Sequence, residues 1–430
     1  MRVLVLGAGV SGMAAARLGR SRGMTVGIYA EETTPEALSE GFAVAGGSWD
    51  PMLLEGVDLV VASPGFSERS APIVDTLERG VPLWSEIELA WRHLRSPVAA
   101  VTGTNGKTTV TEMTSAMLES SGLKAPATGN IGAPLSEFAD QEYDALVVEV
   151  SSFQLRFIEQ FHPLAAAITN VAMDHLDWHG SMYSYREAKR RIYENQDQDD
   201  LLVYDVDDDG ATDLAKGAPS RLVPASGRRL PAGGAGVADG ALVVGDTSIE
   251  ITELASDDPS HLANLACAGV LALEMGANAM GVTRGALEYR PGAHRRSLVL
   301  RANGVSWVND SKATNPHAAV ASIRAHKSVV LIAGGLPKGL DLSPIAAEPG
   351  VKMLLGIGEA GPTLVEMAGE RGRLAGTLET AVVMAREVAK PGDTVLLAPG
   401  CASFDQFISY GNRGERFVEL VNEAVKDRSG

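Results

Sequence analysis

The sequence predicts an α/β protein of three domains, because an apolar strand leads three times into a polar or glycine-rich turn followed by a helical pattern. Such an alternation is typical of parallel sheets covered by helices. The length of 430 residues also exceeds what a single hydrophobic core usually organises. The three strands are 3–6, 98–102 and 305–309, and the domains that we place around them are 1–85, 86–291 and 292–430.

Shorter apolar runs supply the other strands of each domain. The polar segment 196–210 and the glycine-rich segment 231–240 are predicted to form loops and hairpin turns. The acidic run Asp205–Asp209 is interpreted as a solvated loop rather than a calcium site. The additional strands that we expect are 25–29, 58–62, 81–84, 145–150, 165–169, 328–333, 353–357 and 394–398.

Charge and cysteine content exclude several function classes. Lys and Arg number 37 against 54 Asp and Glu, so the formal net charge is −17. A general binder of nucleic acid or anionic membranes needs a broad basic surface, which this composition does not offer. The two cysteines, Cys267 and Cys401, indicate neither a disulfide framework nor a thiolate metal site, and they fit a reducing cytoplasm. We expect neither a signal peptide nor a membrane span, because the apolar runs are too short.

The first turn has the glycine spacing of a dinucleotide-binding fold. Gly7, Gly9 and Gly12 follow a strand, and the acidic Glu31 and Glu32 come roughly twenty residues later. This pattern alone would suggest a nicotinamide-dependent oxidoreductase, but the same glycines also serve tight helix–strand packing. A second turn, residues 63–65, leaves a strand at the same sheet edge, so a diphosphate compound that is not a redox cofactor also fits.

The segment Gly103–Thr109 has the residues of a phosphate-binding loop. Its sequence is Gly-Thr-Asn-Gly-Lys-Thr-Thr, directly after an apolar strand. In such an element the backbone N–H groups face an anion, the lysine neutralises the β- and γ-phosphates, and the next hydroxyl can reach Mg2+. The common form of this loop would place glycine at position 101, where this chain has Val101, so the loop is a variant.

Two residues that follow neighbouring strands are candidates for metal binding. Glu149 ends an apolar run, and a carboxylate beside a phosphate loop is well placed for Mg2+, although a surface glutamate would look the same. His175 lies in Asp174-His175-Leu-Asp177 and could be a ligand or a partner of the γ-phosphate, or could simply cap a loop.

Lys189 stands on an apolar helical stripe. Tyr185, Lys189 and Ile192 are spaced i, i+4 and i+7, which places them on one face of a helix. A buried ammonium group is costly, so it must pair with an anion or lose its charge. The alternative is a lysine that extends along the stripe to solvent.

The third region gathers polar residues at strand ends. His294-Arg295-Arg296 is followed by Asn309–Pro316, which holds an aspartate, a lysine and two hydroxyls directly after a strand. Lys338 and Ser403 follow two further strands, and we expect Ser403 to open a helix. At one sheet edge these groups would suit ribose, phosphate and carboxylate contacts.

These segments together resemble the Mur ligase family, the ATP-dependent amide-forming enzymes of peptidoglycan synthesis. The resemblance covers essentially the whole chain, and the third region is similar to the member that adds D-glutamate. The segments that carry it are the phosphate loop, Glu149-x-Ser-Ser-Phe-Gln154, Asn170, His175-x-Asp177, Tyr185-x-x-x-Lys189, Asn309–Pro316 and Ala398–Phe407.

The resemblance implies a fold, substrates and a role for each matched residue. The fold would comprise a Rossmann-like UDP-binding domain, a central P-loop ATPase-like domain and a C-terminal Rossmann-like domain. The substrates would be UDP-N-acetylmuramoyl-L-alanine, D-glutamate and ATP, used with two Mg2+ ions by a monomer. Ser11, Ser63, Gly65, Asn130 and His175 would bind the UDP-sugar; Gly103, Thr104, Asn105, Gly106, Lys107, Thr108, Thr109, Asn264, Arg295 and Asp310 would bind ATP; Thr108, Glu149, His175 and a carbamylated Lys189 would hold metal; Thr314, Lys338, Ser403 and Tyr410 would bind D-glutamate; Lys107, His175, Lys189 and Lys312 would be catalytic.

Two positions depart from the family pattern. Leu262 stands in His261-Leu-Ala-Asn264, where the family commonly has His-Asn-x-x-Asn, on the adenine side. Tyr29-Ala-Glu31 stands where relatives often have Asp-Thr near the uracil.

The implied reaction passes through an acyl phosphate that the amine of D-glutamate attacks. Alignment and charge neutralisation would then supply the catalysis, with the third domain closing over the second. The alternatives are a nicotinamide-dependent oxidoreductase, a nucleotide-sensing protein without ligase activity, and a Mur-type or folate-type ligase with another acceptor.

Overall fold

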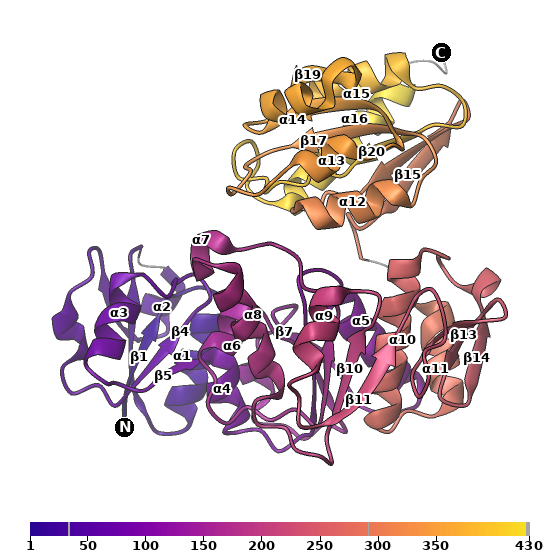
Figure 1. The fold of residues 1–430 in the computed structure, drawn as a ribbon. Helices are drawn as coiled ribbons and strands as arrows, with labels where there is room; N and C mark the ends of the chain where they lie inside the picture. Colours follow the sequence, from indigo (N-terminus) through magenta and orange to yellow (C-terminus); the bar gives the residue numbers. More distant parts are fainter. Residues whose placement is uncertain (33–34, 291, 427–430) are drawn as a thin grey trace. The chain divides into compact units, whose positions relative to one another are not determined.

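The computed structural model describes residues 1–32, 35–290 and 292–426. The chain divides into two compact units, and Figure 1 colours it along the sequence. The first unit comprises Met1–Val171 and Trp178–Tyr289, and the second comprises Ala172–Asp177 and Arg290–Gly430. The domain boundaries that we place at 85/86 and 291/292 stay predictions, and residue 291 lies outside the described residues.

The first unit begins with a five-stranded parallel sheet. Its strands, in spatial order, are β3 (Ala43–Gly46), β2 (Thr25–Ala30), β1 (Arg2–Leu6), β4 (Leu59–Ala62) and β5 (Leu83–Ser85). The accompanying helices are α1 (Val10–Ser21), α2 (Pro35–Ser39), α3 (Ala71–Glu78) and α4 (Glu86–Trp91), with the 3-10 turn η1 (Pro51–Leu54).

A six-stranded parallel sheet and a small antiparallel sheet complete the first unit. The parallel strands, in spatial order, are β11 (Arg221–Ala225), β10 (Leu201–Asp205), β9 (Ala165–Ile168), β6 (Val98–Thr102), β8 (Leu146–Glu149) and β7 (Ala127–Gly129). The small sheet consists of β12 (Gly236–Ala238), β13 (Ala241–Val244) and β14 (Thr247–Glu250). The helices of this part are α5 (Lys107–Ser120), α6 (Ser152–Arg156), α7 (Leu176–His179), α8 (Met182–Arg190), α9 (Asp209–Ala215), α10 (Pro259–Glu274) and α11 (Ala279–Glu288), with η2 (Leu135–Phe138), η3 (Arg191–Tyr193) and η4 (Ile251–Glu253).

The second unit contains a six-stranded sheet in which β15 pairs antiparallel with β16 and the other pairs are parallel. Its strands, in spatial order, are β15 (Ser297–Ala302), β16 (Val305–Asn309), β20 (Thr394–Leu397), β17 (Val329–Gly334), β18 (Val351–Ile357) and β19 (Gly372–Gly376). Its helices are α12 (Pro316–Arg324), α13 (Ser343–Ala347), α14 (Gly361–Ala368), α15 (Leu378–Val388) and α16 (Tyr410–Lys426), with η5 (Gly369–Arg371).

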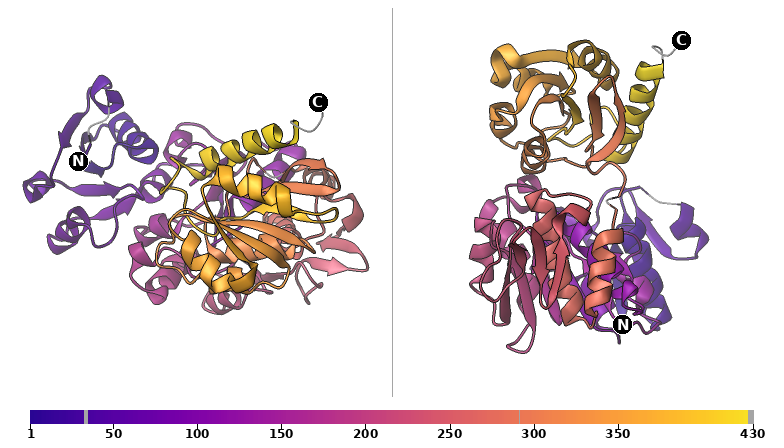
Figure 2. Two further views of the ribbon diagram at one scale, coloured as in Figure 1. Left: turned by 90° about the horizontal axis from the view of Figure 1, so that it is seen from above. Right: turned by 90° about the vertical axis from the view of Figure 1, so that its right-hand side faces the viewer.

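The large sheets have a hydrophobic core on each face. In β6, Val98 and Ala100 belong to one core cluster and Ala99 and Val101 to another, as the two-residue period of a strand requires. The strand is therefore apolar at every position, which is typical of a parallel strand covered by helices on both sides. Figures 1 and 2 show helices on both faces of these sheets. The predicted α/β class is confirmed.

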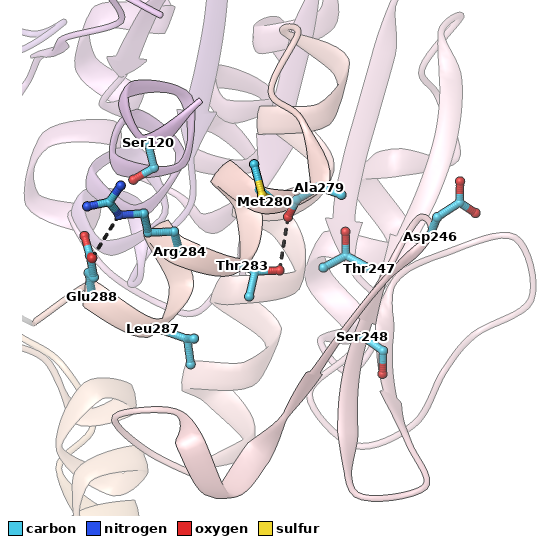
Figure 3. A pocket seen from close by; sticks show the side chains of 10 residues that line it. All are labelled: Ser120, Asp246, Thr247, Ser248, Ala279, Met280, Thr283, Arg284, Leu287 and Glu288. Carbon is cyan, nitrogen blue, oxygen red and sulfur yellow. Dashed lines mark hydrogen bonds and ion pairs between the residues drawn. The ribbon is translucent and has the colours of Figure 1, made fainter. Parts of the chain in front are cut away.

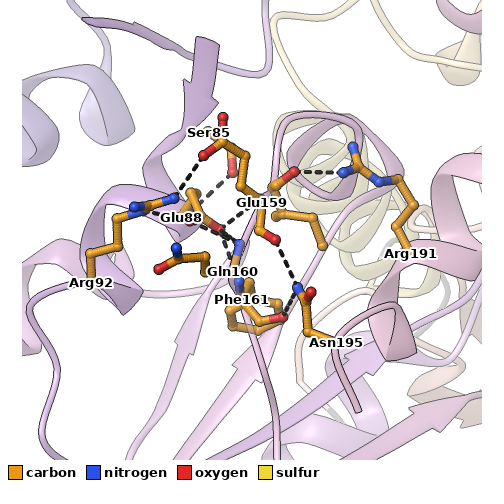
Figure 4. Close-up of polar contacts among 9 residues, drawn as sticks. Ser85, Glu88, Arg92, Glu159, Gln160, Phe161, Arg191 and Asn195 are labelled. Carbon is orange, nitrogen blue, oxygen red and sulfur yellow. Dashed lines mark hydrogen bonds and ion pairs between the residues drawn. The ribbon is translucent and has the colours of Figure 1, made fainter. Parts of the chain in front are cut away.

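A buried carboxylate joins the first two sheets. Glu88 of α4 is fully buried, and its carboxylate accepts hydrogen bonds from the backbone N–H groups of Glu159, Gln160 and Phe161 at 2.9–3.1 Å (Figure 4). Arg92 donates to Glu88 at 2.7 Å, so the charge is compensated as well as hydrogen-bonded. This contact fixes α4 to the loop that leads into β9.

Three sequence-based expectations need correction. The segment 196–210 is not a loop throughout, because it contains β10 and the first residues of α9. The acidic run is not simply solvated: Asp208 caps α9 by accepting from Ala211 N, and burial raises the pKa of Asp205 to about 7. Ser403 opens a turn rather than a helix, since its carbonyl accepts from Gln406 and Phe407 N, whereas α16 begins seven residues later.

Candidate functional site

The glycine turn at the start of the chain lies against Ser63. A Cβ at Gly7 would lie 2.9 Å from Ser63 Oγ, and a Cβ at Gly12 would lie 2.0 Å from the Gly7 carbonyl oxygen. Since β1 and β4 are parallel neighbours, the turns after them share one sheet edge. The structure thus brings Ser11, in the first turn of α1, to the same edge as Ser63 and Gly65. Ser63 Oγ is buried and has no hydrogen-bond partner among the described residues.

The phosphate loop requires its two glycines. Gly103 adopts φ +152° and Gly106 adopts φ +86°, a region that side chains disfavour. A Cβ at Gly103 would lie 1.9 Å from Thr169 Oγ1, and one at Gly106 would lie 2.6 Å from Asn264 Oδ1. Gly106 is also the residue that caps α5. The predicted ATP residue Asn264 therefore lies directly against the loop.

The loop is held by the end of β9. Asn170 Oδ1 accepts from Asn105 N at 2.8 Å, and Asn170 Nδ2 donates to Asn105 O at 2.9 Å. The backbone N–H of Thr104 donates to Asn170 O at 2.8 Å. Contacts within the protein thus hold the loop in place, which is the preorganisation that electrostatic catalysis requires.

Two lysine side chains meet at one carbonyl of the loop. Lys107 Nζ donates to Gly103 O at 2.9 Å and to Thr104 O at 3.0 Å, and Lys189 Nζ donates to Gly103 O at 2.7 Å. Lys189 is 1 % exposed, so the alternative in which it extends to solvent is wrong. Its ammonium group also lies 4.5 Å from the ring centroid of Tyr185, whose hydroxyl is 3.0 Å from Thr104 Oγ1.

Glu149 lies at the carboxyl end of β8, beside the strand that leads into the loop. It is paired in register with Val101, is 2 % exposed, and accepts from Asn130 Nδ2 at 2.8 Å through Oε1. Its Oε2 atom is buried without a hydrogen-bond partner among the described residues. A buried carboxylate oxygen without a donor is unfavourable unless a cation satisfies it. The surface-residue alternative for Glu149 is wrong, and the structure joins it to Asn130.

The donor set around Glu149 fits Mg2+. In the described part of the chain, no group of three or more His, Cys, Asp or Glu side chains could hold a metal ion. Mg2+ does not need such a group, because it commonly binds one or two carboxylates together with substrate phosphates and water. The hydroxyl of Thr108, in the first turn of α5, supplies a further oxygen next to Lys107.

In the second unit, the turn after β16 is also fixed by buried polar contacts. Asp310 is 6 % exposed and accepts from Arg296 N at 3.1 Å, while Lys312 N donates to His294 O at 3.1 Å. Burial raises the pKa of Asp310, although Arg296 and Arg295 favour its charged form. The predicted nucleotide residues Arg295, Asp310 and Lys312 therefore lie together.

The turns that carry Lys338 and Ser403 are paired through their backbones. Leu336 N donates to Ala402 O at 2.9 Å, and Ala402 N donates to Leu336 O at 3.0 Å. Lys338 adopts φ +52°, an uncommon conformation for lysine. Tyr410 is 40 % exposed, and Lys312 Nζ lies 5.5 Å from its ring centroid. The predicted amino-acid residues thus share one edge of the sheet.

Arg413 is a residue that sequence analysis missed. It is 1 % exposed, and its guanidinium donates to Ser311 Oγ and O and to Cys401 O at 2.9–3.3 Å. It therefore ties the turn after β16 to the turn after β20. Its spacing with the buried Phe417 and Val421 at i, i+4 and i+8 on α16 was the signal in the sequence.

His175 belongs to the second unit with the rest of 172–177. It has φ +53°, its Nε2 lies 3.6 Å from Asp174 Oδ2, and Asp174 in turn accepts from Asn315 Nδ2 at 3.0 Å. Its predicted metal and UDP-sugar roles stay predictions, as do the roles of the other residues named above.

Family models match three parts of the chain. They are the Mur ligase MurD-like N-terminal domain over residues 1–85, the Mur ligase middle domain over 101–228 and the Mur ligase glutamate ligase domain over 294–401. A curated UDP-N-acetylmuramoylalanine--D-glutamate ligase of Streptomyces coelicolor is 38% identical, with 98% of each chain covered. The chain belongs to the Mur ligase family. The ligase of the same name from Mycobacterium tuberculosis is 35% identical to this Mur ligase, covering 99% of the chain and 96% of the relative.

Solved structures show the same fold. UDP-N-acetylmuramate-alanine ligase MurC from Thermotoga maritima has a TM-score of 0.59 at 19% identity and covers 99% of this Mur ligase and 100% of that chain. MurF ligase from the same organism has a TM-score of 0.60 at 17% identity, covering 93% and 95%. These likenesses confirm the three-domain α/β fold of the family. In the residues that the structure describes, no helix is long and apolar enough to cross a membrane.

The pocket drawn in Figure 3 lies away from the predicted site. It has a volume of about 600 Å³ and is lined by the end of α5, the start of β14 and α11. Arg284 and Glu288 of α11 form an ion pair at 3.0 Å beside it. None of the predicted site residues lines this pocket, so it contributes nothing to the functional assignment.

Proposed function

We propose that this Mur ligase joins D-glutamate to UDP-N-acetylmuramoyl-L-alanine at the expense of ATP, in the synthesis of a peptidoglycan precursor. The observation that carries the proposal is the meeting of Lys107 and Lys189 at the Gly103 carbonyl, with the buried Glu149 on the adjacent strand. The Lys107 ammonium group and a cradle of backbone N–H groups attract a polyphosphate anion. The curated relatives, matched over nearly their whole length, carry the name of this reaction.

The ATP half of the reaction needs positioning and charge neutralisation rather than covalent chemistry by side chains. Lys107 would neutralise the phosphates, and Asn264 would contact the nucleotide next to Gly106. The alanine carboxylate would attack the γ-phosphorus, which gives an acyl phosphate and releases ADP. The amine of D-glutamate would then attack the acyl carbon, and phosphate would leave from the tetrahedral intermediate.

Mg2+ would be held by Glu149 and Thr108, and as a Lewis acid it would neutralise charge on the phosphate oxygens. We propose two ions and a carbamate on Lys189 as a further ligand. The burial of Lys189 next to Lys107 supports this, since two ammonium groups repel each other in a low dielectric. The Lys189 ammonium would first lose one proton, and the neutral amine would then attack CO2 and release a second proton, so that a buried cation becomes an anion.

The amino-acid half would be bound by the second unit. Lys338 and Ser403 lie on turns that pair through their backbones, and Lys312 faces Tyr410. A lysine with neighbouring hydroxyls suits the carboxylates of D-glutamate. Thr314 lies in the same turn as Lys312, to whose carbonyl its N–H donates. Asp310 and Arg295 would contact the nucleotide, and His175 would orient the attacking group.

We further propose that the chain acts as a monomer in the cytoplasm. Both cysteines are buried and unbonded, which suits a reducing compartment. Size-exclusion chromatography with light scattering tests the oligomeric state. A stable dimer would contradict this part of the proposal.

A comparison of four candidate amino-acid acceptors tests the proposed reaction. Phosphate release is measured with ATP, Mg2+ and UDP-N-acetylmuramoyl-L-alanine, with D-glutamate, L-glutamate, L-lysine or L-alanine as acceptor. Release that depends on D-glutamate alone supports the proposal. Release with L-lysine or L-alanine would instead indicate another Mur-type ligase, and release with none of them would remove the assignment.

A further inference from the structure

Glu68 reaches from the N-terminal sheet to the central part of the first unit. It lies three residues after Gly65 and five after Ser63, both predicted to contact the UDP-sugar. Its Oε2 lies 2.9 Å from Arg156 Nε, and its Oε1 lies 3.6 Å from His179 Nδ1. The Glu68 side chain is 22% exposed and that of His179 is fully buried. The Glu68 carboxylate, in the segment predicted to bind the UDP-sugar, is therefore fixed to the part of the first unit that contains the six-stranded sheet.

His179 contacts two helices that flank the phosphate loop. Its Nε2 lies 2.9 Å from the hydroxyl of Ser152, the first residue of α6 and the third after Glu149. Its ring stacks on Phe153 at 5.5 Å and lies against Tyr185 of α8 at 5.3 Å. A buried imidazole that is hydrogen-bonded at Nε2 and packed against aromatic rings is restricted in orientation, so it helps to fix the side chains it touches.

The contacts continue from Tyr185 to the phosphate loop. The Tyr185 hydroxyl lies 3.0 Å from Thr104 Oγ1, and its ring lies under Lys189 Nζ, which donates to Gly103 O. Glu68, His179 and Tyr185 thus form an unbroken series of contacts between the loop of Ser63 and the loop of Gly103.

We propose that Glu68 and His179 are positioning residues that couple binding of the UDP-sugar to the geometry of the phosphate loop. This inference rests on the proposed function, because it takes the segment after β4 to bind the UDP-sugar. Neither residue touches a substrate; both act through Ser152 and Tyr185. A ligand that shifts the loop of Glu68 must move this packed series, and close-packed side chains transmit such shifts.

Coupling of this kind is measurable without turnover. If the UDP-substrate changes the affinity for the nucleotide by some factor, the nucleotide must change the affinity for the UDP-substrate by the same factor, because binding at linked sites is reciprocal. The probes are UDP-N-acetylmuramoyl-L-alanine and a β,γ-imido ATP analogue with Mg2+. Their dissociation constants are measured by calorimetry, each alone and each with the other at saturation.

The variants are Glu68→Gln, which keeps the shape and removes the charge, and His179→Gln, which keeps one polar contact. We expect the parent to show coupling within the range of about 5- to 150-fold that is typical of linked sites. Each variant should lose most of that factor while retaining each single-ligand affinity, and the double variant should lose no more than either single one.

Asp140→Asn is the matched control. Asp140 pairs with Arg22 at 2.7 Å, an ion pair that also joins the N-terminal sheet to the central part but lies outside the series. It should leave the coupling factor unchanged. Thermal unfolding identifies any variant that does not fold, and the partly exposed Glu68→Gln keeps the test decisive if His179→Gln fails.

Coupling that survives in folded Glu68→Gln would overturn the inference and leave the proposed function intact. A parent protein that binds both ligands without coupling would overturn it in the same way. A parent that does not bind the UDP-substrate would instead remove the proposed function, and the inference with it.

Discussion

Lys107 and Lys189 donate to the same acceptor, the carbonyl oxygen of Gly103, at 2.9 and 2.7 Å. One lysine comes from the helix that the phosphate loop opens, and the other from a helix more than eighty residues later in the chain. The pairing explains why Lys189 occupies an apolar stripe, since its target is a backbone group of the loop.

Replacing Lys189 by alanine should abolish most of the activity. If its carbamate holds metal, kcat should fall by roughly 100- to 1,000-fold, the range for loss of one preorganised polar group that stabilises transition-state charge. Binding of UDP-N-acetylmuramoyl-L-alanine without ATP should survive, because its predicted contacts lie elsewhere. Steady-state kinetics and calorimetry check both parts, and equal activity in variant and parent would show that Lys189 serves packing only.

Glu149→Gln should weaken the response to Mg2+. The amide can still accept from Asn130, so the fold should persist, but the buried Oε2 charge is lost. The Mg2+ concentration for half-maximal activity should rise by at least about tenfold, as for loss of a group that supports a metal site. Titration of activity with Mg2+ measures this. An unchanged titration curve would remove Glu149 from the metal site.

Gly106→Ala should weaken nucleotide binding, both because the left-handed backbone strains an alanine and because the added Cβ would clash with Asn264. Its Cβ would meet Asn264 Oδ1 at 2.6 Å. Gly122 has the same φ of +86°, but a Cβ added there would meet no atom within 4 Å, so Gly122→Ala carries the strain without the clash. We expect the affinity for the ATP analogue to fall in the first variant only, and equal losses in both would exclude the close approach as the cause.

Glu86 should make the stability of the first unit depend on pH. Burial raises its pKa from 4.5 to about 7, although the hydrogen bond that one carboxylate oxygen accepts from Ser136 N at 2.6 Å acts in the opposite direction. The folded state thus holds the proton more tightly than the unfolded chain. The contribution to stability is full below about pH 4.5 and is lost as the pH rises to about 7, by on the order of a few kcal/mol.

Glu86→Gln removes this titration, so its unfolding midpoint should fall less than that of the parent as the pH rises from about 5 to about 8. The matched control is Glu137→Gln at a neighbouring exposed carboxylate, which should follow the parent closely. If the unfolding midpoints of Glu86→Gln and of the parent changed with pH in the same way, Glu86 would not be the source of the pH dependence.

Local sequence patterns predicted many of the strands, the polar turns after them and the place of Lys189 on the apolar face of a helix. Each of these depends on a few consecutive or helically spaced residues, as at Val98–Thr102 and at Tyr185 with Lys189. β10 was missed because Leu201–Asp205 is short and lies between polar segments, and its place in the sheet depends on pairing with β9 and β11.

Contacts between distant segments could not be predicted from local patterns. Ser403 lies after a strand and looks like the start of a helix, but its carbonyl closes a turn instead. Arg413 donates a hydrogen bond to Ser311, which is 102 residues away in sequence, and His179 lies at hydrogen-bond distance from Ser152, which is 27 residues away. No spacing rule specifies such pairs, because they form only when the sheets assemble.

The most direct test of the central claim is the identity of the product. The protein is incubated with ATP, Mg2+, UDP-N-acetylmuramoyl-L-alanine and isotopically labelled D-glutamate, and the UDP-linked products are examined by mass spectrometry. We predict one labelled glutamate per UDP-sugar, formed in equal amount to ADP and phosphate. ATP cleavage without incorporation of the label, or incorporation of L-glutamate in its place, would contradict the account.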